Sequence, residues 1–157
     1  MRRLHTKAVQ VPVLIIAVLS IEPRGMPQPA ANAPFPFAYV QKGCGPTDGV
    51  AMEFYFTRKQ SSGSGKYEEP FLLIAVNKGL PESAPKRYSI TSGTDAVLAS
   101  RCLKPASCEA STSGFLYLSR FRAGVGASGD YELHFQNGSS EKGHFDATWY
   151  HNRLLCG

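Results

Sequence analysis

Apolar and polar residues alternate along most of the chain after residue 33, and the alternation is clearest near the end. Polar residues separate Tyr131, Leu133 and Phe135, and the same spacing recurs from Phe145 to Trp149. A period of two places alternate side chains on opposite faces of a β-strand. By this pattern we expect strands at residues 50–57, 71–76, 88–90, 96–102, 115–121, 129–135 and 141–150.

Three of these segments carry more detailed expectations. In the first strand, the set Val50, Met52, Phe54 and Phe56 is expected to point inward. Residues 71–76 form a continuous apolar run, which predicts a central strand covered on both faces. Residues 34–40 are rich in proline and aromatic residues, and they favour an edge strand or a loosely docked arm.

The last two strands predict a hairpin, because Asn137-Gly138 is the strongest short-range hairpin signal. A two-residue loop would put the two apolar rows on opposite faces. A loop with an odd number of residues, for instance residues 137–139 with a glycine bulge, keeps the two apolar rows on one face. Tyr131 would then face Phe145 across the pair.

The fold class follows from these short strands with turn signals between them. After the first 33 residues no helical pattern of ten residues is found. We therefore predict an all-β protein, an antiparallel β-sandwich of about seven or eight strands, with a barrel as the alternative. Residues 34–157 would form one domain, and Trp149 is expected in its core.

The beginning of the chain has the composition of a secretory signal. Arg2, Arg3 and Lys7 precede an apolar run over residues 9–19, which is too short to span a membrane as a helix. We expect residues 1–33 to be a signal peptide and short leader, cleaved between Gly25 and Ala33. The predicted location is secreted or periplasmic, with no membrane contact beyond this segment.

The four cysteines agree with export, since an even number in a small exported chain predicts disulfides. Cys102 and Cys108 enclose a short loop and are expected to pair. Cys44 would then pair with Cys156 and join the start of the domain to its end. Neither pair has the spacing of a structural zinc site.

Charge and glycine patterns exclude two classes of partner. Four of the 17 Lys and Arg residues and one of the 12 Asp and Glu residues precede Pro34, so the remaining chain is nearly neutral. Without a concentrated basic run we expect no nucleic-acid binding. The glycines of residues 124–129 match a dinucleotide fingerprint, but they lead into a strand rather than a helix, so we interpret them as a turn and expect no cofactor.

One group of side chains resembles a reactive site. With the odd hairpin loop, Glu132, His134, Lys142, His144 and Asp146 share the polar face. His134, His144 and Asp146 are therefore the candidate metal ligands, since imidazole and carboxylate groups suit zinc. His151 is a further histidine whose position the pattern does not fix. Ordinary solvated residues on the outer face of a sheet are the simpler interpretation, and we expect no metal.

The expected function is an exported, non-enzymatic β domain with a binding or structural role and an unknown envelope or extracellular partner. No serine lies in a nucleophile elbow, and the four cysteines are expected to be oxidised. Two alternatives remain. One is a metal-dependent hydrolase that uses the hairpin face, and the other is an inhibitor-type module that uses the polar loop from Arg58 to Glu69.

Overall fold

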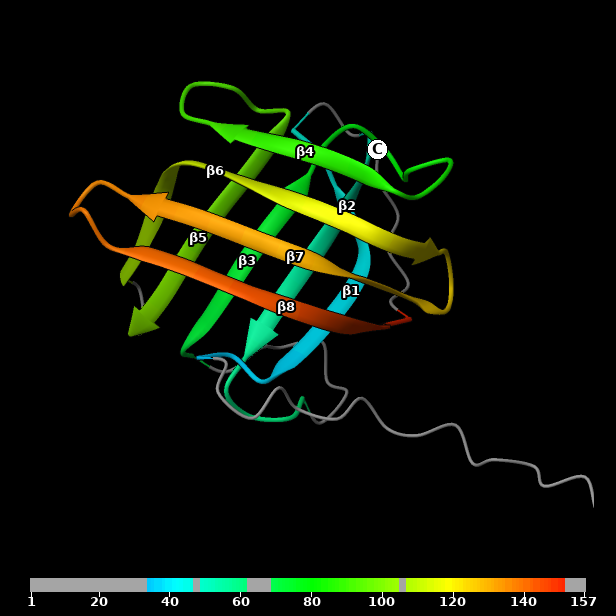
Figure 1. The fold of residues 1–157 in the computed structure, drawn as a ribbon, viewed down its shortest axis with the longest axis horizontal. Coiled ribbons are helices and arrows are strands. Elements are labelled where there is room, and N and C mark those ends of the chain that lie inside the picture. The colour runs from blue at the N-terminus through cyan, green and yellow to red at the C-terminus, as the bar shows by residue number, and fades with distance from the viewer. Residues whose placement is uncertain (1–33, 47–48, 62–68, 105–106, 152–157) are drawn as a thin grey trace, which may run out of the picture.

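The structure, a computed structural model, describes residues 34–46, 49–61, 69–104 and 107–151 (Figure 1). The expected leader, residues 1–33, lies outside the described residues, as do residues 62–68 of the polar loop. All regular elements of the described chain are strands. They are β1 (Phe37–Cys44), β2 (Val50–Thr57), β3 (Phe71–Val76), β4 (Lys86–Thr91), β5 (Val97–Lys104), β6 (Ser107–Arg122), β7 (Gly126–Phe135) and β8 (Ser140–Trp149).

Seven strands close into a barrel, and β4 is added to it. The hydrogen-bonded order is β6, β5, β3, β2, β1, β8, β7 and back to β6, while β4 pairs with β6. This confirms the all-β prediction in its barrel form. The barrel consists of two layers, in which β4, β6, β7 and β8 cross in front of β1, β2, β3 and β5 (Figure 1). All described pairings are antiparallel except the short parallel contact between β1 and β8.

Strand β6 is what closes the barrel on one side. It has 16 residues, and its first part pairs with β5 while the rest pairs with β4 on the same edge. Its other edge pairs with β7 along most of its length. Only the second part, residues 115–121, was expected as a strand. The first part is rich in small polar residues and shows no apolar alternation.

The barrel interior is filled by the inward residues of all strands. Phe54, Phe56 and Phe145 form an aromatic centre, with ring centroids 5.6 Å apart for Phe54 and Phe145 and 5.3 Å apart for Phe56 and Phe145. Tyr131 packs against Phe56 at 4.7 Å. Offset and edge-to-face arrangements of this kind are favoured by aromatic rings. Trp149 is also part of this core, as expected.

Several local expectations need correction. Strand β1 is not an edge strand, because it pairs with both β2 and β8. Val50, at the start of β2, is 45% exposed and does not join the inward set. Strand β3 is central, but Phe71, Leu73 and Ala75 on its outer face are only half-buried. The expected turn over residues 124–129 is shorter, since β7 already begins at Gly126.

The loop of the hairpin between β7 and β8 has an odd number of residues, as expected, but the two strands do not pair in the expected register. Phe135 and Ser139 share a backbone hydrogen bond, and Gly138 donates its N–H to the Phe135 carbonyl. The loop is thus Gln136 to Gly138, with Gly138 at φ 80° in its last position. A three-residue loop of this type needs its left-handed residue last, so the glycine fixes where the loop ends. Tyr131 therefore faces Gly143 rather than Phe145.

Disulfide chemistry agrees with the prediction where the structure describes it. Cys102 and Cys108 are bonded and face each other across β5 and β6. Cys44 is also in a disulfide, but the predicted partner Cys156 lies outside the described residues, so that pairing stays a prediction. A stable bridge indicates an oxidising compartment of the extracellular type. Among the described residues, no helix is long and apolar enough to cross a membrane.

Candidate functional site

The outer face of the β7–β8 hairpin carries the candidate metal ligands. His134 Nε2 lies 3.1 Å from a carboxylate oxygen of Glu132 on the same strand. His144 Nδ1 lies 3.0 Å from Asp130, which is directly opposite it on β7. Each imidazole is therefore paired with its own carboxylate. Both pairs are substantially exposed, as expected of ion pairs on a solvated sheet.

Asp146, the third candidate ligand, belongs to a different cluster. It accepts a hydrogen bond from Ser128 Oγ at 2.8 Å and lies 3.5 Å from Arg120. The corrected register places Asp146 opposite Ser128 and His144 opposite Asp130. The structure does not bring His134, His144 and Asp146 together, and no three His, Cys, Asp or Glu side chains in the described part of the chain form a metal-sized group.

His151, the remaining candidate, lies exposed at the end of the described chain. It lines an open cavity of about 370 Å³ together with Lys42, Leu80, Ala123, Gly124 and Trp149. The ring of Trp149 packs against Phe121 at a centroid distance of 6.2 Å. The carboxylate contacts of the hairpin histidines, His134 with Glu132 and His144 with Asp130, do not involve His151.

A charged cluster that the sequence did not indicate lies at one end of the barrel. Arg101 points inward from β5 and is buried, and its guanidinium contacts Glu109 at 2.8 Å and Glu141 at 3.0 Å. It also donates to Ser139 Oγ at 2.9 Å and lies 4.1 Å from the ring centroid of Phe135. Burial lowers the pKa of Arg101, but the hydrogen bonds and charges of the two glutamates outweigh it, and the net pKa is raised. This cluster ties β5, β6 and β8 together.

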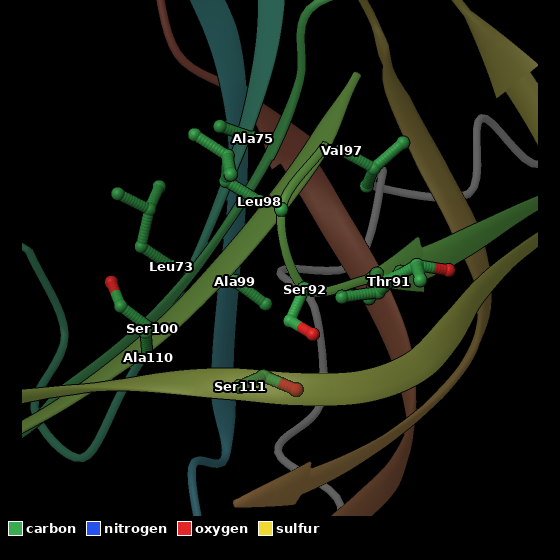
Figure 2. A pocket seen from close by; sticks show the side chains of 12 residues that line it. Leu73, Ala75, Thr91, Ser92, Val97, Leu98, Ala99, Ser100, Ala110 and Ser111 are labelled. Atoms are coloured by element: carbon green, nitrogen blue, oxygen red, sulfur yellow. The ribbon is translucent and has the colours of Figure 1, made fainter. Parts of the chain in front are cut away.

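A second recess in the described structure lies where β5 and β4 share one edge of β6. Strand β5 pairs with β6 only as far as Ala110, and β4 begins its pairing at Ser113. The register of β6 shifts between Ser111 and Ser113. Between the two pairings lies a cavity of about 370 Å³, which we call the β4–β5 slot (Figure 2).

The slot lies along one edge of β5, with lining residues on both faces of that strand. Leu73 and Ala75 of β3 and Leu98 of β5 lie on one side of that strand, while Val97, Ala99, Thr91 and Ser92 lie on the other (Figure 2). The rest of its lining consists of Ile90, Gly93, Ser100, Ala110 and Ser111. No lining residue is ionisable, and the polar groups are hydroxyls and backbone amides. Leu98, at the rim, is 44% exposed.

Such a recess is suited to binding rather than to acid–base chemistry. Its volume is in the range of small ligand sites, which are mostly apolar with a few placed polar groups. Ser111, the most buried hydroxyl there, contacts the backbone carbonyl oxygens of Ser113 at 2.8 Å and His134 at 2.9 Å. Its O–H is thus directed at carbonyl groups and not at an imidazole or a carboxylate that could activate it.

Sequence reasoning missed the slot because its residues come from four strands and are chemically ordinary. The one available signal was the run from Ser107 to Ser113, where the apolar alternation is interrupted. Comparisons with protein-family models, with curated proteins and with solved structures found no match for this chain.

Proposed function

We propose that this chain is an exported, non-enzymatic binding domain and that its ligand occupies the β4–β5 slot. The observation that carries the proposal is the slot itself: a recess of about 370 Å³ with an apolar, uncharged lining and an exposed leucine at its rim. An uncharged recess favours an uncharged, largely apolar ligand or ligand segment, because a charged group would lose its hydration there without gaining a counter-charge.

Export is supported by two independent features. The Cys102–Cys108 bridge requires an oxidising compartment to persist. The basic residues and short apolar run at the start of the chain have the pattern of a secretory signal. We therefore place the mature domain outside the cytosol, in the periplasm, in the envelope or outside the cell.

The proposal is tested with a small uncharged apolar probe, 1-anilinonaphthalene, added to the oxidised mature chain. We expect saturable fluorescence enhancement and amide chemical-shift changes confined to the lining residues, at positions 73, 75, 90–93, 97–100, 110 and 111. Ala110 is exposed at the slot, so Ala110→Leu narrows the recess without disturbing the core and should weaken probe binding about tenfold, the effect of losing roughly 1.4 kcal/mol.

Ser113→Leu is the matched control, since Ser113 is exposed on the same strand but does not line the slot. It should leave probe affinity unchanged. Equal binding to both variants, or shifts centred on another surface, would refute the assignment of the slot. Unchanged near-ultraviolet circular dichroism in both variants confirms that the comparison is between native folds.

A further inference from the structure

We propose that the ligand of the β4–β5 slot is an extended peptide segment, which adds to β5 as an extra strand at residues 97–99. This inference rests on the proposed function, because it names the class of ligand that the slot takes. Its basis is the direction of the backbone groups of β5, which the side-chain lining alone does not reveal.

The pairing of β5 with β3 fixes which backbone groups face the slot. Asn77 donates its N–H to the Ala96 carbonyl, which continues the antiparallel register in which Ala75 is opposite Leu98. In an antiparallel pair, the backbone groups of alternate residues point to the same edge. Leu98 and Ser100 therefore bond to β3, while the N–H and C=O groups of Val97 and Ala99 point away from β3, toward the slot.

On that side β5 has no strand partner before Ser100 among the described residues. Ser100 and Ala110 form a non-hydrogen-bonded pair, so the bond that flanks them runs from the Ser111 N–H to the Ala99 carbonyl. The pairing of β5 with β6 ends there. The N–H and C=O groups of Val97 and the N–H of Ala99 thus lie at the open edge of β5, although both residues are buried. Buried backbone donors and acceptors are nearly always paired in proteins, so this edge is suited to a partner strand.

The slot also matches the side chains of such a strand. Side chains of an added strand alternate between two faces, and the slot offers apolar groups on both. Leu73, Ala75 and Leu98 lie on the outer side, and Val97 and Ala99 lie on the inner side (Figure 2). Strand addition of this kind gains affinity from main-chain hydrogen bonds and specificity from pockets for alternate side chains.

A further open edge in the described part of the structure, that of β4, is chemically different. Strand β4 pairs only with β6, and it carries Lys86 and Arg87. Charged residues on an edge strand oppose pairing with another chain, whereas residues 97–99 of β5 carry no charge. Of these two edges, that of β5 is therefore the one that favours an uncharged extended peptide.

Backbone-modified peptides test this directly. The probe is a blocked heptapeptide of alternating valine and threonine, compared with two analogues that are N-methylated at the valines or at the threonines. Side chains are identical in all three, but each analogue lacks the amide donors of one edge. We expect the parent and one analogue to bind and the other analogue to lose about tenfold or more in affinity, since it cannot pair with β5.

Amide hydrogen exchange provides the protein-side measurement. In the free protein, the amides of Val97 and Ala99 should exchange faster than those of Leu98 and Ser100, which bond to β3. The peptide should slow exchange at Val97 and Ala99. Equal protection of all four amides in the free protein, or equal affinity for both N-methylated analogues, would overturn the inference.

The outcomes separate this inference from the proposed function. If the anilinonaphthalene probe binds the slot and the peptide does not, the slot remains a ligand site and strand addition is wrong. If neither binds, both proposals fail. If Val97 and Ala99 become protected as protein concentration rises and the chain sediments as a dimer, the partner is a second copy and the peptide is refuted.

Discussion

Replacing Arg101 by methionine tests how the barrel is held closed at one end. The substitution keeps most of the length of the side chain but removes the charge that pairs with Glu109 and Glu141. Both carboxylates then lose their buried counter-charge. Ser139 also loses a hydrogen bond and the Phe135 ring loses its stacked guanidinium.

The magnitude follows from the exposure of the partners. Removing one member of a buried ion pair costs about 3 to 5 kcal/mol, because a buried charge is left uncompensated. Here the side chain of Glu141 is 18% exposed and that of Glu109 is 34% exposed. Because water screens the more exposed carboxylate, we expect Arg101→Met to lower the free energy of unfolding by about 2 to 3 kcal/mol.

Urea unfolding of the oxidised chain measures this cost. We expect the midpoint to fall by about 1 to 2 M. Arg120→Met is the matched control, since Arg120 is an exposed arginine that contacts Asp146 at 3.5 Å, and it should change stability by less than about 0.5 kcal/mol.

A double-mutant cycle with Glu141→Gln separates the pair from its surroundings. The double variant should cost about 1 kcal/mol less than the sum of the single variants, because the second substitution removes one of the stranded charges. Equal stability of the Arg101 and Arg120 variants, or strict additivity in the cycle, would refute the closing role of this cluster.

Three further outcomes can be measured on the same chain. Replacing Cys102 and Cys108 by alanine should lower the free energy of unfolding by about 2 kcal/mol in the chain-entropy model, as measured by urea unfolding against the parent protein. A methyl group on Gly114, which has a φ of 149°, would overlap the Glu132 carbonyl, so Gly114→Ala should cost about 2 kcal/mol or more while Ser113→Ala costs little; similar urea midpoints would contradict this. Burial and then the Glu141 charge raise the pKa of Tyr131 in the folded protein. The contribution of Tyr131 to the free energy of unfolding is therefore complete below about pH 10, and it is lost as the pH rises further and the phenol of the unfolded chain ionises. Stability should therefore fall more steeply above about pH 10 in the parent than in Tyr131→Phe.

Alternation predicted the faces of the strands well because burial imposes it directly. Met52, Phe54 and Phe56 are fully buried, as expected for the inward set of β2. Alternation shows only which face of a strand each side chain occupies, however, and not which residue of the neighbouring strand lies opposite it. The hairpin register was displaced by two residues because a shift of two keeps every side chain on its face, and only the loop geometry at Gly138 distinguishes the alternatives.

Whether the candidate ligands form a site depends on the register between the strands, which alternation does not determine. His134, His144 and Asp146 share a face, but distances along the strands decide whether they meet, and each is paired with a different neighbour. The β4–β5 slot was still less accessible to sequence reasoning. It depends on where one pairing of β6 ends and the next begins, and no chemically distinctive residue marks that point.

Barrel closure and the slot have a common origin in the first part of β6. From Ser107 to Ser113 the strand carries small polar residues and buries no continuous apolar row, so its position is set by hydrogen bonds to β5 and β7. Such a segment can bend from one layer to the other, and Figure 1 shows it rising beside β5 before the rest of β6 crosses in front. The bend lets β6 join the two layers, and it also withdraws β6 from Val97 and from the N–H of Ala99. A sequence change that straightened β6 would therefore extend the β5–β6 ladder and fill the slot at the same time.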